Sequence, residues 1–370
     1  MEIDASALQA NLEEVRRRAD PARLIPMVKA DAYGLGVRAT IRTLRGRGVW
    51  GFGVATVEEG CELRDLGVDE PVVVFTPVWA GEVERAVGAG LTLAVSGAST
   101  LKQLAAAARR TGDRPAFHLE VDTGMGRAGL PWDRAREWGP RLASILEGEP
   151  LRWTGLFTHF HSADRLRESE MRSQWDRFQE VREVLQEVMV PPDDLLIHAC
   201  NSAALLRHPA LAAGAVRPGI FLYGGQPGTG LPEPLPVVSV RARIGLVREV
   251  EAGATVGYGA TYRAQGRERW ATVEMGYGDG LPRALSNGGA VLVRGRRAPI
   301  AGRISMDMTV VDITRVPEVQ AGEVVTFVGR DGDERISLEE FATWAGTINY
   351  EILTGFARRV PRIWLGGGEG

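Results

Sequence analysis

Lysine is rare in this chain of 370 residues, with two lysines, Lys29 and Lys102, against 42 arginines. Lys29 follows the apolar run Leu24–Val28 and precedes a loop that contains Gly34. An amine at the end of an apolar strand is partly removed from water, and this favours its neutral form. The neutral amine forms Schiff bases with aldehydes, which arginine cannot do because it keeps its proton. Lys29 is therefore a candidate for covalent chemistry, whereas Lys102 lies on an Ala-rich helical stretch and is interpreted as solvated.

Groups that could bind a ligand lie at the ends of later β-rich runs, directly after them or, for the last run, within it. They are Arg127, His159, Asn201, Ser202, Arg217, Gly219 and Ile220. In a barrel of parallel strands the active site lies at the C-terminal strand ends, and phosphate sites often use the last two loops. Ser202 supplies a hydroxyl there, and Gly219 and Ile220 supply backbone N–H groups. A Schiff-base lysine and a phosphate cradle on one rim are what a pyridoxal phosphate site requires.

Eight β-rich runs alternate with helical stretches over the first 225 residues. The runs are Leu24–Lys29, Trp50–Ala55, Val72–Phe75, Thr92–Ser96, Ala116–Asp122, Trp153–Phe160, Leu195–Asn201 and Val216–Tyr223. One connecting segment, Ser169–Met189, has apolar side chains such as Phe178 and Leu185 on one helical face. The last connecting helix, Ser202–Arg207, is short. The alternation predicts a closed (β/α)8 barrel, a TIM-like fold of parallel strands.

A Pro- and Gly-rich stretch, Pro227–Pro236, marks a change in the character of the chain. Further β-rich runs follow at Val237–Val250, Trp270–Met275, Ala290–Val293, Met308–Ile313 and Val324–Val328. They predict a mostly antiparallel β domain. One helix is expected within it, at Leu338–Gly346, with Ser337 as its N-cap. We therefore expect a barrel over residues 1–228 and a β domain over residues 229–370.

The overall composition limits the class of protein. A net charge of −3 and a pI near 6.1 give no reason to expect nucleic acid or an anionic membrane as a partner. Cys61 and Cys200 have no metal-ligand spacing and indicate buried thiols in a reducing compartment. The N-terminal residues lack a basic-then-apolar signal pattern, and no apolar run is long enough to cross a bilayer. We therefore expect a cytoplasmic protein.

The segment Met27–Gly36, Met-Val-Lys-Ala-Asp-Ala-Tyr-Gly-Leu-Gly, resembles the cofactor-attachment motif of alanine racemases. The resemblance continues in order along nearly the whole chain, through Asp122–Gly129, Thr158–Asp164, His198–Ala203, Val216–Gly224, Gly276–Arg283, Gly302–Asp307 and Arg359–Arg362. It implies an enzyme that interconverts L-alanine and D-alanine through an aldimine of pyridoxal 5'-phosphate. It also implies that the D-alanine supplies peptidoglycan synthesis.

The resemblance assigns roles in cofactor binding to residues of the barrel. They are Lys29, Tyr33, Arg127, His159, Asn201, Ser202, Arg217, Gly219 and Ile220. Lys29 holds the cofactor and is one catalytic base, while the phosphate is held by Tyr33, Ser202, Gly219 and Ile220. Arg217, oriented by His159, donates to the pyridine nitrogen. An arginine there leaves that nitrogen unprotonated, which limits the spread of negative charge from Cα and discourages side reactions.

The resemblance assigns the second base to Tyr277, because racemisation needs a base on each face of the substrate. An unperturbed tyrosine has a pKa of ~10, so it needs help to act near neutrality. Arg127 is matched to the residue that contacts the substrate carboxylate, and Met306 and Asp307 to residues that close the substrate pocket. In the family Tyr277, Met306 and Asp307 reach the site of the other subunit. A head-to-tail homodimer is therefore implied.

Two positions depart from the family pattern. Glu120 stands where the family often has a lysine, sometimes carbamylated, that orients the arginine equivalent to Arg127. Glutamate supplies the anion directly, so we expect no need for carbon dioxide. Arg358 stands where we match a phosphate-contacting tyrosine of some members, and it could bind phosphate by its charge.

Three alternatives remain open at this point. A non-catalytic pyridoxal phosphate-binding homeostasis protein would resemble the barrel alone, so the β domain with Tyr277 argues against it. A barrel-type decarboxylase of basic amino acids would need a glutamate in place of Arg217. A metal-dependent hydrolase could use His159 and His161, which strand alternation puts on one face. No third ligand is placed convincingly with that pair, so we expect no metal site.

Overall fold

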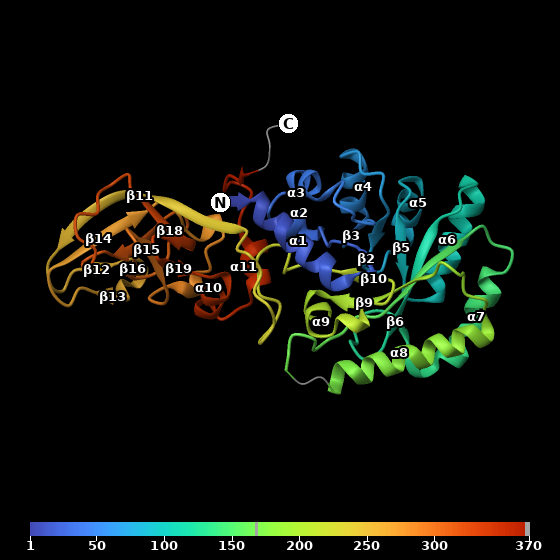
Figure 1. The fold of residues 1–370 in the computed structure, drawn as a ribbon. Helices are drawn as coiled ribbons and strands as arrows, with labels where there is room; N and C mark the ends of the chain where they lie inside the picture. The colour runs from blue at the N-terminus through green and yellow to red at the C-terminus, as the bar shows by residue number, and fades with distance from the viewer. Residues whose placement is uncertain (167–168, 367–370) are drawn as a thin grey trace.

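The structure, a computed structural model, describes residues 1–166 and 169–366. It consists of two parts that lie side by side, a barrel from the N-terminal part of the chain and a β domain from the C-terminal part (Figure 1). Helix α11 (Asn349–Gly355) lies where the two parts meet (Figure 1). Because α11 contacts α2 (Lys29–Tyr33), the junction lies beside the barrel rim that contains Lys29.

Eight parallel strands form the barrel, and this confirms the predicted fold. They are β2 (Arg23–Leu24), β3 (Phe52–Val54), β4 (Val72–Val74), β5 (Thr92–Val95), β6 (Ala116–Asp122), β8 (Arg152–Phe157), β9 (Leu196–Asn201) and β10 (Ala215–Arg217). From β3 to β10 each of these strands pairs with the next, β10 pairs with β2, and a bridge between Met27, after β2, and Gly53 of β3 closes the ring. A short strand, β7 (Leu130–Pro131), extends β6. Strands such as β4 are buried along their whole length, as parallel strands covered by helices must be.

Helices cover the outside of the barrel. They are α1 (Ala5–Ala19), α3 (Val37–Leu44), α4 (Val57–Asp65), α5 (Ala80–Gly88), α6 (Ala98–Thr111), α7 (Ala135–Leu146), α8 (Ser169–Val188) and α9 (Ser202–Arg207), with 3₁₀ turns η1 (Trp132–Arg134) and η2 (Pro209–Leu211). Helix α8 buries the predicted apolar face, including Phe178 and Leu185. In the described part of the chain no helix is both long and apolar enough to cross a membrane.

The first and last barrel strands are shorter than predicted. We expected strands at Leu24–Lys29 and Val216–Tyr223, but β2 ends at Leu24 and β10 ends at Arg217. Two prolines explain both ends, because Pro26 and Pro218 have no N–H to donate to a neighbouring strand. After Pro218 the chain turns, with Leu222 N–H donating to the carbonyl of Gly219 at 2.9 Å. This turn places the backbone of Gly219 and Ile220 at the rim instead of in a strand.

The second sheet also has nine strands and is antiparallel except where β1 pairs with β20. Its strands are β1 (Glu2–Asp4), β11 (Val238–Val250), β14 (Glu268–Val273), β15 (Ala290–Val293), β16 (Arg296–Pro299), β17 (Thr309–Asp312), β18 (Val324–Asp331), β19 (Glu334–Ile336) and β20 (Ile363–Leu365). Smaller elements are the hairpin β12 (Thr255–Val256) and β13 (Tyr262–Arg263), and the 3₁₀ turns η3 (Tyr258–Ala260), η4 (Tyr277–Asp279) and η5 (Arg283–Leu285). Strand β1 belongs here although we expected residues 1–228 to form the barrel. The division between residues 228 and 229 stays a prediction.

The predicted helix of the β domain is present as α10 (Leu338–Ala345), with Ser337 Oγ accepting the N–H of Glu340 at 3.1 Å. Buried apolar side chains of the barrel and of the β domain belong to one contiguous core cluster. Among them are Leu222 from the barrel and Leu353 from α11. The shared core fixes how α11 approaches the barrel rim.

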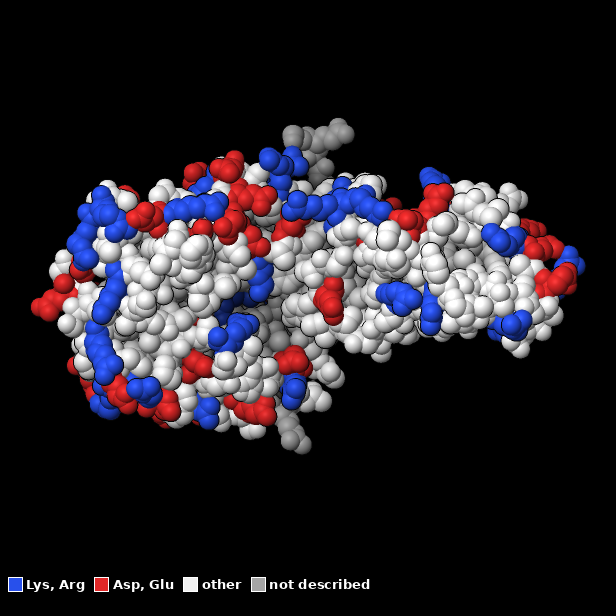
Figure 2. All heavy atoms as spheres, turned by 180° about the vertical axis from the view of Figure 1, so that it is seen from behind, with Lys and Arg blue, Asp and Glu red and all other residues white. Residues whose placement is uncertain are grey.

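Charged side chains of both signs are mixed over the face shown in Figure 2. Many form ion pairs at the surface, such as Arg85 with Glu58 at 3.0 Å and Arg134 with Glu137 at 2.7 Å. Such exposed pairs each contribute little, about 0–1 kcal/mol. The abundant arginines are thus mostly solvated, and an arginine that is fully buried needs a separate explanation.

Candidate active site

One pocket of about 240 Å³ lies at the C-terminal ends of the barrel strands. It brings together all the residues that we expected to bind a cofactor, namely Lys29, Tyr33, Arg127, His159, Asn201, Ser202, Arg217, Gly219 and Ile220. It is also lined by Met27, Phe75, Glu120, Phe157 and Tyr350. The residues expected from the β domain, Tyr277, Met306 and Asp307, do not line this pocket within the same described chain.

Lys29 begins the turn α2, in which the next four residues adopt the left-handed conformation. The φ angles of Ala30, Asp31, Ala32 and Tyr33 lie between 53° and 57°. Each non-glycine residue in this conformation costs roughly 1–2 kcal/mol, so the turn must be held by other contacts. Burial lowers the pKa of the Lys29 amine, and the positive charge of Arg127 lowers it further. The lowered pKa increases the neutral fraction of the amine, which is the nucleophilic form.

Arg217 forms the floor of the pocket and is 4% exposed. Its Nη1 donates to His198 Nδ1 at 2.7 Å, and its Nη2 donates to the carbonyl of Thr158 at 2.8 Å and to His159 Nδ1 at 3.3 Å. These bonds use the two terminal nitrogens. Within residues 1–166 and 169–366, Arg217 Nε–H has no protein acceptor, so one donor remains for a group in the pocket.

The hydrogen bonds of Arg217 fix the tautomers of two buried histidines. Because a guanidinium only donates, His198 Nδ1 must accept, and His198 Nε2–H then donates to His118 Nδ1 at 2.9 Å. Burial, assisted by the charge of Arg217, lowers the pKa of His118 to about 3 and that of His198 well below the ordinary value. Both rings are therefore neutral. The resemblance names His159 as the residue that orients Arg217, yet His198 is the nearer histidine to Arg217.

The loop after β10 and the start of α9 form a cradle of donors. Gly219 N–H donates to Ser202 Oγ at 2.9 Å, and Ser202 is the first residue of α9. A Cβ at Gly219 would lie 2.3 Å from Tyr33 Oη, so glycine is required for this close approach. Burial raises the pKa of Tyr33, which keeps its phenol protonated. Hydroxyls and backbone N–H groups beside a desolvated lysine fit a phosphate-bearing aldehyde such as pyridoxal phosphate.

Glu120 lines the pocket, but its bonded partner differs from the one we expected. It is 4% exposed and accepts a hydrogen bond from Ser96 Oγ at 2.7 Å. In the described part of the chain no hydrogen bond joins it to Arg127. Burial raises the pKa of Glu120, although the Ser96 bond and the charges of Arg217 and Arg127 act in the other direction. Its action on Arg127 is therefore through charge over a distance.

Tyr350 is a pocket residue that sequence reasoning missed. It lies on α11, and its ring is 6.2 Å from that of Tyr33 between centroids. Burial raises its pKa to about 12, so its phenol stays protonated. Arg358 does not line the pocket, so our match of that position to a phosphate-contacting tyrosine is corrected: Tyr350 is the tyrosine at the pocket. No strand end marks Tyr350, because it comes from the other part of the molecule.

Tyr277, Met306 and Asp307 lie together on the surface of the β domain. Tyr277 N–H donates to the carbonyl of Ser305 at 3.0 Å, and Gly278 N–H donates to that of Met306 at 2.7 Å. The side chains of Tyr277 and Met306 are 40% and 53% exposed. The backbone thus holds these residues as one rigid unit that faces outward.

The two histidines considered as metal ligands, His159 and His161, form hydrogen bonds to different partners. His159 Nδ1 accepts from Arg217, while His161 Nδ1 lies 2.5 Å from Ser162 Oγ. In the part of the chain that the structure describes, no group of three or more His, Cys, Asp or Glu is placed to hold a metal ion. The structure therefore offers no ligand set for the hydrolase alternative.

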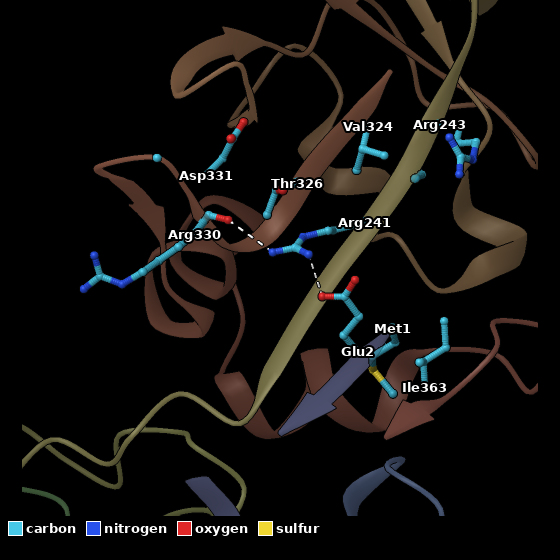
Figure 3. Close-up of a pocket in the computed structure, with 11 residues that line it drawn as sticks. Met1, Glu2, Arg241, Arg243, Val324, Thr326, Arg330, Asp331 and Ile363 are labelled. Atoms are coloured by element: carbon cyan, nitrogen blue, oxygen red, sulfur yellow. Dashed lines mark hydrogen bonds and ion pairs between the residues drawn. The ribbon is translucent and has the colours of Figure 1, made fainter. Parts of the chain in front are cut away.

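A larger hollow, of about 570 Å³, lies on the β domain between β1, β11 and β18 (Figure 3). Arg241 crosses it, donating to Glu2 Oε2 at 2.6 Å and to the carbonyl of Arg330 at 3.4 Å (Figure 3). Its central charge is thus already paired within the protein, and no lysine, cysteine or histidine lines it. The chemistry belongs to the smaller pocket at Lys29.

Comparison with known proteins agrees with this geometry. The model of the alanine racemase N-terminal domain matches residues 3–227, and that of the C-terminal domain matches residues 237–364. The alanine racemase of Halothermothrix orenii is 38% identical over 365 residues, which cover 98% of this chain and 95% of that protein. The alanine racemase of Symbiobacterium thermophilum is 38% identical over 371 residues, which cover 100% of this chain and 97% of that protein.

Solved structures are similar over the same length. The crystal structure of alanine racemase from D-cycloserine-producing Streptomyces lavendulae has a TM-score of 0.94 and 34% identity, covering 99% of this chain and 96% of that chain. The structure of alanine racemase from Bacillus anthracis with bound L-Ala-P has a TM-score of 0.91 and 32% identity, covering 100% of this chain and 95% of that chain. The two parts of the chain are thus similar to the two domains of one family, and the chain belongs to the alanine racemase family.

Proposed function

We propose that this chain is a pyridoxal 5'-phosphate-dependent racemase that interconverts L-alanine and D-alanine. The observation that supports it most strongly is the pocket in which Lys29, Arg217 and the Ser202–Gly219 cradle lie together. In this proposal Lys29 would bind the aldehyde of the cofactor, Arg217 would bind its ring nitrogen and the cradle would bind its phosphate. The relatives named alanine racemase support the choice of substrate.

When bound, pyridoxal phosphate supplies a covalent link to the amino group of the substrate and a ring that withdraws electrons from Cα. Lys29 would be the first base: in one direction of the reaction its neutral amine would accept the Cα proton from one face, and in the other direction its protonated amine would deliver a proton to that face. Arg217 would donate a hydrogen bond to the ring nitrogen without giving up a proton, because even its lowered pKa is about 10. Arg217 thereby limits electron withdrawal and favours simple proton exchange.

The second base, in this proposal, is Tyr277 of a second copy of the chain. Its phenol is exposed on the β domain and does not line the Lys29 pocket of its own chain. A head-to-tail homodimer would bring Tyr277, Met306 and Asp307 to the partner's pocket. Tyr277 would then give a proton to the face of Cα opposite Lys29.

Arg127 is proposed to bind the substrate carboxylate. It is exposed at the pocket mouth, where a charged guanidinium can form a two-pronged contact with a carboxylate. Met306 and Asp307 of the partner would limit the space for the substrate side chain. We further propose that the D-alanine is made in the cytoplasm and supplies peptidoglycan.

Reduction of the holoenzyme with borohydride tests the proposal. We expect an absorption band near the visible edge that borohydride abolishes, with the cofactor then fixed to the peptide that contains Lys29. Racemisation of L-alanine, followed with D-amino-acid oxidase, should be lost on the same treatment. Lys102 is the internal control, since it is the other lysine of the chain. Cofactor fixed to Lys102 alone, or racemisation that survives complete reduction, would contradict the proposal.

A further inference from the structure

The turn that contains Lys29 is tied to a neighbouring helix by one carboxylate. The N–H of Ala30, the residue directly after Lys29, donates to Glu59 Oε1 at 2.7 Å. Other bonds of the turn are local, such as Ala32 N–H to the carbonyl of Val28 at 2.9 Å. The left-handed conformation costs an alanine roughly 1–2 kcal/mol, so the bond from Glu59, which lies outside the turn, helps to hold Ala30 in it.

Glu59 is itself held in place. It lies in the first turn of α4, whose N-cap Thr56 accepts the N–H of Glu59 at 3.2 Å. Its Oε2 accepts the N–H of Ala55 at 2.7 Å, just after strand β3. One carboxylate therefore joins the chain after β2 to the chain after β3, at the rim where the Lys29 side chain enters the pocket.

Glu59 also affects the charge of the amine. The charged groups that act on Lys29 are Arg127 and Arg217, which lower its pKa, and Glu59, which raises it. Burial lowers this pKa more than any of them. Glu59 is therefore the carboxylate that limits the fall of the Lys29 pKa while holding its backbone.

We propose that Glu59 is a positioning residue for Lys29. Its carboxylate fixes the left-handed turn through Ala30 N–H, sets the direction of the Lys29 side chain and provides the opposing charge. This inference rests on the proposed function, because it takes the Lys29 amine as the reacting group. Glu59 does not itself line the pocket and touches neither substrate nor cofactor.

The chain has two lysines, which makes a direct measurement of the Lys29 pKa practical. The full-length chain, with any cofactor removed by hydroxylamine and its fold checked by circular dichroism, is trace-labelled with dinitrofluorobenzene across a range of pH. Mass spectrometry then gives the pKa of Lys29, with Lys102 as reference in the same sample. The variants are Glu59→Gln and Glu59→Ala. The matched control is Glu58→Gln, which changes the adjacent residue, whose carboxylate pairs with Arg85 at the surface.

We expect Glu59→Gln to lower the Lys29 pKa relative to wild type and to lower kcat by roughly 10- to 100-fold, the range that small misplacements of a reacting group produce. Lys102 and the Glu58→Gln variant should match wild type in both measurements. If Glu59→Ala does not fold, Glu59→Gln decides, because its single amide oxygen cannot join Ala30 N–H to Ala55 N–H as the two carboxylate oxygens do.

An unchanged or raised Lys29 pKa in Glu59→Gln, with kcat equal to that of Glu58→Gln, would overturn the inference. The pKa measurement needs no catalysis, so it separates the two claims. A wild-type chain that does not racemise alanine overturns the proposed function but leaves the pKa comparison valid. A racemising wild type with no effect at Glu59 overturns this inference alone.

Discussion

Arg217 is a buried charge, and among the residues that the structure describes no carboxylate is hydrogen-bonded to it. Burial lowers its pKa to about 10, so it remains protonated near neutrality. Its partners are carbonyl groups and the neutral rings of His198 and His159, which accept hydrogen bonds but do not neutralise the charge. An arginine is suited to this place because its guanidinium is more weakly hydrated than an ammonium and keeps its proton.

Replacing Arg217 with glutamate should change the reaction as well as its rate. A carboxylate at this position would hold a proton on the ring nitrogen, and the stronger electron withdrawal would favour transamination. We expect Arg217→Glu to lower racemisation by roughly 100-fold, as removal of a preorganised donor does, and to form pyruvate from alanine. Arg217→Gln is the control, because it removes the charge without adding a carboxylate. Equal pyruvate formation by both variants, measured with lactate dehydrogenase, would show that the electronic argument is wrong.

The buried carboxyl of Glu120 should make the free energy of unfolding decrease as pH rises, the opposite of what most acidic residues do. Its pKa is raised above 4.5 in the folded chain, so the folded state holds this proton more tightly than the unfolded state. This stabilisation is present below the pKa of Glu120 in the unfolded chain, and it is lost as pH rises through the pKa of Glu120 in the folded chain. Each unit of the shift corresponds to about 1.4 kcal/mol. Glu120→Gln should therefore gain stability relative to wild type as pH rises from 4.5 to 7.5.

Urea unfolding at several pH values measures this difference. Glu58→Gln serves as a control of opposite sign, because backbone hydrogen bonding lowers the pKa of Glu58. The stabilisation by Glu58 is present above its pKa in the unfolded chain, so the stability difference between Glu58→Gln and wild type should stay nearly constant over most of this range and shrink as pH falls below 4.5. A Glu120→Gln difference that does not vary with pH would mean that Glu120 titrates alike in the folded and unfolded chains.

Whether a pocket residue was predictable depended on its place in the chain. Lys29 could be predicted because it ends a β-rich run, and parallel strands bring their ends to one rim. Arg217 lies near the start of the predicted run Val216–Tyr223, and its role was predicted from the resemblance. Phe75 and Phe157 also end strands, but we searched those ends only for polar groups. Tyr350 could not be found in this way, since it reaches the pocket from a helix of the β domain.

At the scale of elements, the loop with Tyr277 is held by one arginine. Arg359 Nε donates to Asp279 Oδ1 at 2.8 Å and its Nη2 donates to Asp307 Oδ1 at 2.7 Å. It thereby joins the turn η4 to the segment that contains Met306. Gly276 fits beneath this turn because a Cβ there would lie 2.3 Å from the carbonyl oxygen of Ser305.

Arg359→Ala should loosen this loop and slow racemisation by roughly 10- to 100-fold through misplacement of Tyr277. Cofactor content should not change, because Arg359 does not line the Lys29 pocket. The adjacent Arg358→Ala is the matched control, and it should keep wild-type kcat. Kinetics and cofactor absorbance on the same preparations measure both effects. Equal activity of the two variants would exclude a positioning role for Arg359.

The predicted boundaries of elements were wrong where the backbone departs from regular strand or helix geometry. The strands before Lys29 and after Arg217 were predicted too long, because apolar side chains continue past Pro26 and Pro218, which cannot donate to the ladder and interrupt its regular pairing. The left-handed turn at Ala30–Tyr33 has no local signal, since its alanines favour the right-handed helix. Its conformation depends on Glu59, which is distant in sequence, so a local pattern could not predict it.

At the scale of the whole molecule, the two bases that we propose, Lys29 and Tyr277, do not lie at one site of a single chain. Lys29 lies at the barrel rim, while Tyr277 is exposed on the β domain and lines another surface. Met306 and Met308, also about half exposed, lie in the same segment, and such apolar groups are expected where a partner covers the surface. A two-fold dimer would satisfy both observations, since each subunit would give its Tyr277 to the pocket of the other.

Mixing two inactive variants tests this arrangement. Lys29→Ala retains Tyr277, and Tyr277→Phe retains Lys29, so neither homodimer has both bases at one site. In a heterodimer with exchange of Tyr277, one site has both bases and the other has neither. Random exchange makes half of the dimers mixed, so activity should return to about one quarter of wild type for two-fold symmetry.

Subunit exchange must be verified separately, for example by native mass spectrometry of the mixture. The control is a mixture of Lys29→Ala with the double variant Lys29→Ala/Tyr277→Phe, which lacks Lys29 in every chain and should stay inactive. If Tyr277 served the pocket of its own chain, every site in the first mixture would still lack one base. Verified heterodimers without recovered activity would therefore mean that Tyr277 acts within its own subunit or is not the second base.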